Sequence, residues 1–260
     1  MAVALITGAS AGIGAEFAEQ LAQRGYDLVL VARSPDKLQA IADTVSQQRH
    51  VKATVIVQDL TTPDAAANVC AQLEQQQIQP DMLVNNAGFG TYGEFADGDL
   101  STYLNMIQLN TMVLVDLTYR CLQTMKERQT GSILNIASTA AFQPIPYFAV
   151  YAATKAFVLS FSEGLWFECK PHNINVIGVC PGPTETQFFK TADFPDSLGE
   201  SVGQNYTSPQ AVVDDALQAL DNGQSNVVTG GLTNQLLVNA GRFLPREALT
   251  GAVGRMFKTQ

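Results

Sequence analysis

The chain has 260 residues, of which 46% are hydrophobic and 15% are charged, and this globular composition argues against a disordered protein. Lys and Arg together number 15 and Asp and Glu 24, so the formal net charge is −9. An acidic chain repels phosphodiester backbones, and we therefore expect no nucleic-acid partner. No stretch approaches the roughly 18 apolar residues that a transmembrane segment requires.

The cysteines and histidines predict no metal site. The four cysteines form no CxxC pair, and two histidines are too few for the clusters that hold structural zinc. We interpret all four cysteines as small buried side chains in a reducing compartment. The first residues run directly from Val3–Ile6 into a glycine-rich turn, so we expect no signal peptide and a cytoplasmic protein.

Apolar runs alternate with helical patterns along the chain, and each run is short and rich in branched residues, as a buried strand is. Parallel strands joined by helices form a sheet that helices cover on both faces. The sequence therefore predicts a doubly wound α/β fold with a central parallel sheet of about seven strands, in a single domain over residues 1–260. The expected strands are Val3–Ile6, Leu28–Val31, Val51–Val57, Met82–Val84, Ile133–Ile136, Ile174–Val179 and Asn226–Thr229.

Residues 7–14, with the sequence TGASAGIG, connect the first expected strand to the first helix. Glycines in such a turn let the backbone approach a pyrophosphate, whose charge the helix N-terminus stabilises. The spacing GxxxGxG differs from the GxGxxG of the common dinucleotide motif, so a glycine-rich turn without a ligand is the alternative. We predict a nucleotide site that includes Gly8, Ser10, Ala11, Gly12, Ile13 and Gly14.

Tyr151 is the only one of the seven tyrosines with a lysine four residues later. Residues i and i+4 share a helix face, so the ammonium of Lys155 is expected near the phenol. A phenol with a pKa of about 10 is a weak base at neutral pH, and a nearby cation favours the ionised form that acid–base catalysis uses. Ser138 follows the fifth expected strand, at the edge where open α/β sheets bind ligands.

With the segment Asn85–Gly88 (NNAG) after the fourth expected strand, the sequence resembles the short-chain dehydrogenase/reductase family, single-domain Rossmann enzymes that use NAD(H) or NADP(H). The resemblance extends from Ala2 to about Thr229. It implies that the NNAG segment braces the sheet beside the cofactor and that Asp59 contacts the adenine. The cofactor residues that it adds are Asp59, Leu60, Asn86, Ala87 and Gly88.

The same resemblance implies the catalytic roles. Ser138 hydrogen-bonds the substrate oxygen, and Tyr151 is the general acid in reduction and the general base in oxidation. Lys155 lowers the pKa of the tyrosine and holds the cofactor ribose, so Tyr151 and Lys155 also belong to the cofactor site. Asn110, in the long helix after the fourth strand, holds a water that links the lysine to a proton relay. Taken singly, these residues also suit a turn serine, a core tyrosine and a helix-bending asparagine.

The segment Pro181–Thr186 (PGPTET) follows the sixth expected strand and resembles the proline-glycine motif of the family. The resemblance implies that Thr186 contacts the nicotinamide carboxamide. Cys180 directly precedes the motif, but no basic residue adjoins it in sequence, so we interpret it as a buried thiol and not a nucleophile. The cofactor contacts expected in this segment are Pro181, Gly182, Thr184 and Thr186.

The end of the second expected strand favours NADP(H) over NAD(H). An acidic residue there would bind the ribose hydroxyls and repel a 2′-phosphate, but Ala32 occupies this place and Arg33 follows. A guanidinium suits a phosphate in both charge and geometry. A surface arginine without a ligand is the alternative, and the glycine turn has Ala11 where many NADP-dependent relatives place a basic residue.

Two segments are expected to shape the substrate site. Residues 187–206 include three phenylalanines and are expected to form a lid. With aromatic residues from other loops, they predict an apolar pocket and an apolar substrate of moderate size. Residues 230–260 form an expected helical tail with a basic end, which we expect to pack against the enzyme or a second subunit; a membrane surface or an acidic carrier protein is the alternative partner.

These features predict an NADP(H)-dependent oxidoreductase that transfers a hydride between the nicotinamide and a ketone or aldehyde carbonyl, or the reverse from an alcohol. A 3-oxoacyl-carrier reductase, which uses the same four residues, is an alternative and would need a basic docking patch at the pocket mouth. A non-catalytic NADP-binding redox sensor is the alternative of another class, but it would tolerate the loss of Tyr151, Lys155 or Ser138, and all three are present. The resemblance implies a small-molecule substrate and a homodimer or homotetramer.

Overall fold

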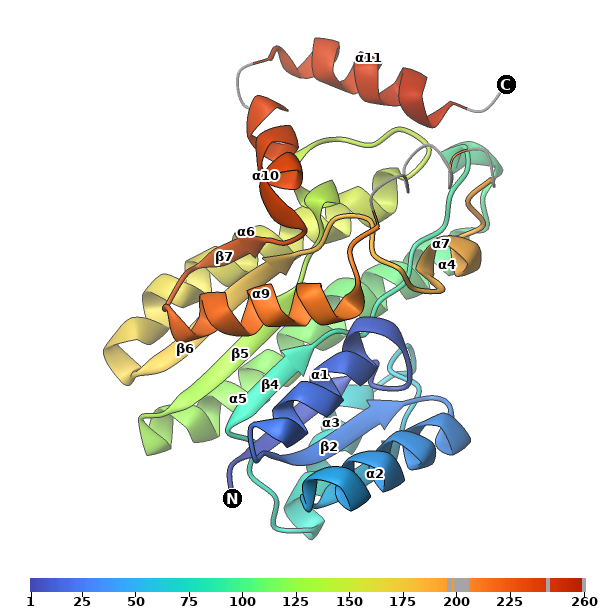
Figure 1. Ribbon diagram of the computed structural model, residues 1–260. Coiled ribbons are helices and arrows are strands. Elements are labelled where there is room, and N and C mark those ends of the chain that lie inside the picture. Colours follow the sequence, from blue (N-terminus) through green and yellow to red (C-terminus); the bar gives the residue numbers. More distant parts are fainter. Residues whose placement is uncertain (196–197, 199–205, 242–243, 259–260) are drawn as a thin grey trace.

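Within residues 1–195, 198, 206–241 and 244–258, which the computed structural model describes, the chain forms a seven-stranded sheet (Figure 1). All neighbouring strands run parallel, in the order β3-β2-β1-β4-β5-β6-β7. The predicted fold class is therefore confirmed, and each expected strand is present with its ends shifted by no more than a few residues. The strands are β1 (Val3–Thr7), β2 (Asp27–Ala32), β3 (Ala53–Val57), β4 (Met82–Asn85), β5 (Gly131–Ile136), β6 (Ile174–Cys180) and β7 (Asn226–Val228).

Helices cover both faces of the sheet, as in a Rossmann fold (Figure 1). On one face lie α1 (Gly12–Gln23), α2 (Pro35–Arg49) and α9 (Pro209–Asp221), and on the other α3 (Ala65–Gln75), α5 (Val113–Arg128) and α6 (Ala149–Cys169). The remaining helices lie beyond the carboxyl ends of the strands or extend the chain from β7. They are α4 (Leu100–Ile107), α7 (Phe188–Thr191), α10 (Gly231–Ala240) and α11 (Arg246–Phe257).

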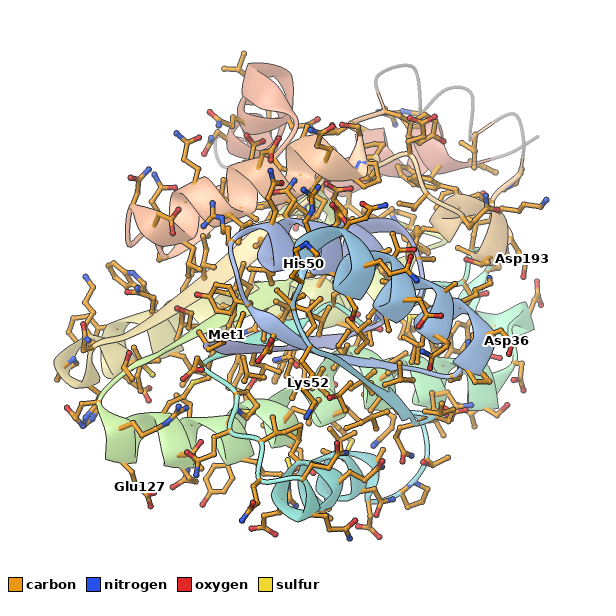
Figure 2. All side chains as sticks on the ribbon, turned by 60° about the horizontal axis from the view of Figure 1, so that its bottom comes forward. Met1, Asp36, His50, Lys52, Glu127 and Asp193 are labelled. Atoms are coloured by element: carbon orange, nitrogen blue, oxygen red, sulfur yellow. The ribbon has the colours of Figure 1, made fainter. Side chains whose placement is uncertain are left out.

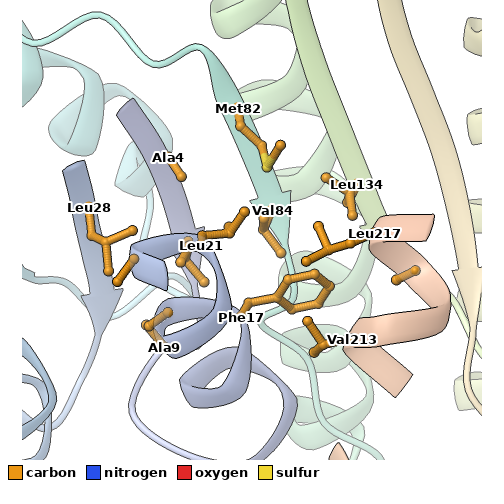
Figure 3. Close-up of a cluster of buried hydrophobic side chains, with 14 of the residues drawn as sticks. Ala4, Ala9, Phe17, Leu21, Leu28, Met82, Val84, Leu134, Val213 and Leu217 are labelled. Atoms are coloured by element: carbon orange, nitrogen blue, oxygen red, sulfur yellow. The ribbon is translucent and has the colours of Figure 1, made fainter. Parts of the chain in front are cut away.

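The core consists of two apolar layers, because side chains along a strand point alternately to the two faces. In β1, Ala4 and Ile6 pack in the layer under α1 and α9, and Leu5 packs in the layer under α3 and α5. Figure 3 shows the ring of Phe17 pointing from α1 towards Val213 and Leu217 of α9. Burial of both faces explains why the strands are apolar at nearly every position.

Helix boundaries follow local signals in the sequence. Pro35 opens α2, where its fixed φ and missing N–H are compatible with the first helical turn. Ser208 caps α9 by accepting a hydrogen bond from the N–H of Ala211 at 3.2 Å. Because all neighbouring strands are parallel, every strand ends at the same edge of the sheet.

The strand order reverses between β1 and β4, which opens a crevice at their carboxyl ends, the usual ligand site of a doubly wound sheet. Figure 2 shows Asp36 and Asp193, which follow β2 and β6, on one side of the molecule, and Met1 and Glu127 towards the other. The glycine turn, the NNAG segment, Ser138 and the PGPTET segment all follow strands and therefore meet at the first of these sides.

Candidate active site

The glycine turn lies between β1 and α1, and its backbone depends on glycine at three places. Gly8 and Gly12 have φ values of +64° and +55°, in the left-handed region that side chains disfavour. A Cβ on Gly14 would lie 2.3 Å from the carbonyl oxygen of Gly8, so α1 packs directly on the turn. Between Gly8 and Gly14 the largest residue is Ile13, and the others are alanine, serine and glycine.

The N-terminus of α1 has the properties of a phosphate site. Ala11 is the N-cap residue and has no polar side-chain group, and the first turn holds no acidic residue, so the helix itself supplies neither a cap nor a negative charge there. Ser10 is half-buried beside this turn, and Ile13 packs partly on the core. The residues present therefore fit a dinucleotide pyrophosphate: the glycines let it approach the backbone closely, and the N–H groups of the helix N-terminus can donate hydrogen bonds to it.

The NNAG segment holds the glycine turn in place. The side-chain amide of Asn86 donates to the carbonyl oxygens of Thr7 and Gly8, at 3.0 and 3.1 Å. In return, the hydroxyl of Thr7 accepts hydrogen bonds from the backbone N–H groups of Asn86 and Ala87, each at 3.0 Å. The carboxyl ends of β1 and β4 are thereby joined on either side of the crevice.

The predicted adenine end contains one exposed cation and one half-buried acid. Arg33 follows β2 and is exposed, and Asp59 follows β3. Burial raises the pKa of Asp59, but hydrogen bonds from Thr61 and the charge of Arg33 outweigh that effect, so the pKa is lowered. The side chain of Leu60 packs in the core beside α3, and so only its backbone is available to a ligand.

Tyr151 lies in the first turn of α6 and is only 8% exposed. The ring of Phe148 stacks on it with the ring centroids 4.4 Å apart. Burial raises the pKa of the phenol above its usual value of 10.0, and a side-chain hydrogen bond with Ser138 acts in the opposite direction. The phenol is therefore protonated at neutral pH and suits a general acid, with Ser138 at its hydroxyl.

Lys155 lies one turn beyond Tyr151, as predicted, with its Nζ 5.6 Å from the centroid of the tyrosine ring. The ammonium donates a hydrogen bond to the carbonyl oxygen of Ile136, at 2.7 Å. Burial lowers the pKa of Lys155 from 10.5 to about 8, and it is therefore still mostly charged at neutral pH. The carbonyl at the end of β5 thus orients the lysine.

Asn110 lies in a π-helical turn, Gln108–Met112, that separates α4 from α5, so the single long helix expected after β4 is in fact two. The extra residue in such a turn redirects side chains and is common at functional sites. The amide of Asn110 donates to the carbonyl of Phe89 and to the hydroxyl of Thr154, at 2.9 and 3.1 Å. A Cβ on Gly88 would lie 2.9 Å from the Oδ1 of Asn110 and 3.5 Å from the Nζ of Lys155, so these three residues meet.

The PGPTET segment joins the crevice from β6. A Cβ on Gly12 would lie 3.0 Å from the Cγ2 of Thr186, which places that threonine against the glycine turn. Thr184 forms a parallel bridge with Thr207, and its hydroxyl donates to the carbonyl of Gly182, at 2.9 Å. Burial raises the pKa of the Cys180 thiol to about 12, so the thiol is protonated at neutral pH.

Of the four cysteines, which are all free, Cys121, Cys169 and Cys180 are buried as expected, whereas Cys70 is only half-buried. Among the described residues, no three His, Cys, Asp or Glu side chains gather as ligands for a metal. Across the same ranges, the helices are all too short or too polar to cross a bilayer.

Sequence reasoning did not single out several residues that complete the site. Thr7 hydrogen-bonds Asn86, and Thr154 hydrogen-bonds Asn110. Asn234 of α10 packs closely on Gly182, because a Cβ on Gly182 would lie 2.3 Å from the Nδ2 of Asn234. Thr7 begins the glycine motif, which is a signal that the sequence offers. Asn234 has no comparable signal, because it is brought to the site only by the packing of α10.

Phe188 of the expected lid packs against Tyr151, and Phe194 packs against the neighbouring Phe148. The rings of Phe188 and Tyr151 are 5.2 Å apart, and those of Phe194 and Phe148 are 4.9 Å apart. The expected tail packs against the enzyme through α11, where Val253 is buried in the same cluster. Residues 196–197 and 199–205 of the expected lid, and residues 242–243 and 259–260 of the expected tail, lie outside the described residues.

Residues 2–195 match the family described as short chain dehydrogenase. The chain is 36% identical over 192 residues to a very-long-chain 3-oxoacyl-CoA reductase from Bos taurus; the match covers 72% of this chain but 61% of that protein, so it spans less than two thirds of the relative. A sulfoacetaldehyde reductase from Chromohalobacter salexigens is 32% identical over 245 residues, which are 94% of each chain.

The structure of a short-chain dehydrogenase from Sphingobium yanoikuyae, solved in complex with NADPH, superposes with a TM-score of 0.82 and 34% sequence identity. The match covers 97% of this chain and 93% of that chain. Similarity in sequence and in fold therefore extends over nearly all of the molecule. The chain belongs to the short chain dehydrogenase family and has a fold that binds NAD(P).

Proposed function

We propose that this enzyme is an NADP(H)-dependent carbonyl reductase in which Tyr151 protonates the substrate oxygen. The observation that carries the proposal is the pairing of the buried, protonated Tyr151 phenol with the Ser138 hydroxyl at the open end of β5. A carbonyl oxygen placed between these hydroxyls accepts a hydrogen bond from each, which stabilises the charge that develops on it. Tyr151 then transfers its proton to that oxygen.

Lys155 and Asn110 act on Tyr151 from the side of the NNAG segment. The ammonium, held by the carbonyl of Ile136, favours the phenolate that proton transfer leaves behind. We propose that Asn110, whose Oδ1 lies near Lys155 and accepts the N–H of Phe89 at 3.1 Å, holds a water on the path by which the phenolate regains a proton. In the direction of alcohol oxidation, Tyr151 accepts the proton.

We propose that the cofactor is held along the crevice from the glycine turn to Thr186. The bound cofactor supplies or accepts the hydride. The proposed contacts are Gly8, Ser10, Ala11, Gly12, Ile13 and Gly14 at the pyrophosphate, Arg33, Asp59 and the backbone of Leu60 at the adenosine end, Asn86, Ala87 and Gly88 beside the sheet, and Tyr151, Lys155, Pro181, Gly182, Thr184 and Thr186 at the nicotinamide end.

NADP(H) is the proposed form of the cofactor. Arg33 is an exposed guanidinium at the end of β2, and Ala32 before it provides no carboxylate that would repel a 2′-phosphate. The neighbour from Sphingobium yanoikuyae, which was solved with NADPH, supports this choice.

An apolar ketone is the proposed substrate, because the rings of Phe148 and Phe188 contact Tyr151 and the ring of Phe194 packs on Phe148. A 3-oxoacyl thioester is the second candidate, favoured by the name of the relative from Bos taurus and by the basic residues Arg246 and Arg255 of α11. The two candidates share the reacting carbonyl and differ in the group attached to it.

We also propose that residues 1–260 form one domain, in which the lid is 187–206 and the helical tail is 230–260. A homodimer or homotetramer is proposed from exposed apolar side chains on neighbouring helices, and light scattering of the purified protein tests it. The free cysteines support a reducing, cytoplasmic compartment. The exposed apolar side chains are Met112, Tyr119, Phe157 and Phe167.

The experiment is a fluorescence titration of the purified enzyme with NADPH and NADH, followed by NADPH-consumption assays on ketones, aldehydes and 3-oxoacyl thioesters. We expect tighter NADPH binding, weakened roughly tenfold or more in Arg33→Ala but unchanged in Arg49→Ala, which removes an exposed cation at the far end of α2. Tyr151→Phe should bind NADPH normally and lose nearly all turnover. Stronger NADH binding refutes the cofactor, and full turnover by Tyr151→Phe refutes the mechanism.

A further inference from the structure

The apolar shell around Tyr151 has a third side, which comes from the C-terminal helix. Leu249, Val253 and Phe257 are spaced four residues apart on α11 and therefore share one face of it. All three pack in the cluster that contains Tyr151, and Val253 is only 6% exposed. Met256, on the same helix, is 65% exposed. Helix α11 thus presents one apolar face to the cluster that contains Tyr151, whereas Met256 is exposed to solvent.

A series of aromatic rings connects the reacting residue to this helix. Phe148 stacks on Tyr151, and Phe194 lies edge-on to Phe148, with centroids 4.9 Å apart. Phe194 in turn meets Phe257 at 6.3 Å. The rings come from α6, from the segment after α7 and from α11, three parts of the chain that are distant in sequence (Figure 1).

Tyr92 fastens two of these parts together. Its backbone N–H donates to the carbonyl of Ala192 at 2.9 Å, and its ring lies 5.0 Å from that of Phe194. Its hydroxyl donates a hydrogen bond to the carbonyl of Phe257, the last residue of α11. Carbonyls in the last turn of a helix lack a partner within the helix, so the tyrosine supplies one.

The helix also lies close to the loop that connects Ser138 to Tyr151. A Cβ on Gly254 would lie 3.1 Å from the Cγ of Pro146 in that loop, which is tighter than most real contacts. Glycine therefore allows α11 to pack closely on the loop. The helix consequently lies against this loop as well as against the apolar cluster that contains Tyr151.

We infer that α11 is the outer wall of the substrate pocket, that Tyr92 fastens it, and that Leu249 and Val253 contact the apolar group of the substrate beyond its carbonyl. This inference rests on the proposed function and deepens it: α11 makes the enzyme select ketones with a long apolar chain over small ones. Tyr92 is a positioning residue, because it acts on the substrate only through α11 and the segment at Ala192.

The test compares the methyl ketones acetone, hexanone and decanone in wild-type enzyme, Val253→Ala and the matched control Met256→Ala. In wild type kcat/KM should rise with chain length, since each buried methylene favours binding. Val253→Ala should reduce the decanone-to-acetone ratio of kcat/KM roughly tenfold, and Met256→Ala should leave it unchanged. An unchanged ratio in Val253→Ala overturns the inference.

Hydrogen exchange provides a readout that needs no turnover. Decanone added to the NADPH complex should protect the amides of α11, and Tyr92→Phe should make those amides exchange about tenfold faster while the amides of α1 keep their rates. Protection of α11 without turnover would support contact between α11 and the ketone but refute the proposed reductase activity. Turnover of decanone without protection of α11 would support the reductase activity but overturn the proposal that α11 contacts the substrate. Unchanged exchange of the α11 amides in Tyr92→Phe would overturn the positioning role of Tyr92.

Discussion

Gly14→Ala is expected to damage the cofactor site through a single added methyl group. The new Cβ would lie 2.3 Å from the carbonyl oxygen of Gly8 and 2.5 Å from the Nδ2 of Asn86. Both atoms belong to the clamp in which Asn86 donates to the carbonyls of Thr7 and Gly8. Ordinary contact begins at 3.4 Å, so the turn has to move away from α1 by about 1 Å.

The magnitude follows from what this displacement breaks. Two hydrogen bonds are strained or lost, at about 1 kcal/mol each, and the overpacking adds about 1 to 3 kcal/mol. We therefore expect the free energy of unfolding to fall by about 3 to 5 kcal/mol. The displaced backbone is the part that we expect to contact the pyrophosphate, so the Kd for NADPH should rise by about tenfold or more.

Urea unfolding measures the first effect and NADPH titration the second. Gly164→Ala is the matched control, because Gly164 lies in α6 with no atom within 4 Å of an added Cβ. Alanine there should stabilise the helix by about 0.5 to 1 kcal/mol and leave the Kd unchanged. The reasoning is refuted if Gly14→Ala binds NADPH as tightly as wild type, whatever its stability.

Three further results are expected in urea unfolding. Burial lowers the pKa of Lys155 from 10.5 to about 8, so between these pH values the unfolded state binds more protons than the folded state. The free energy of unfolding of wild type should therefore rise, relative to that of Lys155→Met, by up to about 3 kcal/mol as the pH rises from 8 to 10.5. A difference between the two proteins that does not change with pH would refute this. Arg128→Ala loses a 2.6 Å ion pair with Asp81 and a hydrogen bond to the carbonyl of Pro80, and should lower the free energy of unfolding by about 1 to 2 kcal/mol. Arg120→Ala, which removes a more exposed ion pair on the same helix, should lower it by about 0.5 kcal/mol or less. Equal losses of stability in the two variants would contradict the difference in burial. Phe17→Ala removes a fully buried ring and should cost about 3 to 5 kcal/mol; a cost under 1 kcal/mol, roughly, would mean that α9 closes the cavity.

Several features of the fold follow from neighbours in the sequence. Buried parallel strands are apolar at nearly every position, which made runs such as Leu28–Val31 visible, and Pro35 marked the start of a helix. Tyr151 and Lys155 share a helix face wherever that helix packs. The π-helical turn at Asn110 was not predicted, because the helices on either side have ordinary helical sequences and the extra residue is stabilised by partners elsewhere.

The sequence by itself determined the order of the strands along the chain, the glycine turn and the spacing of the candidate catalytic residues, since these depend on rules that act over a few residues. The tertiary structure decided which groups are partners. Lys155 bonds a carbonyl 19 positions away, Asn86 bonds the turn 79 positions away, and Tyr92 reaches α11 across 165 positions. Such pairs form only when the sheet and its helices pack against one another. A polar group that packing removes from water needs a hydrogen-bond partner within the protein, and the segment that lies nearest in the fold supplies it.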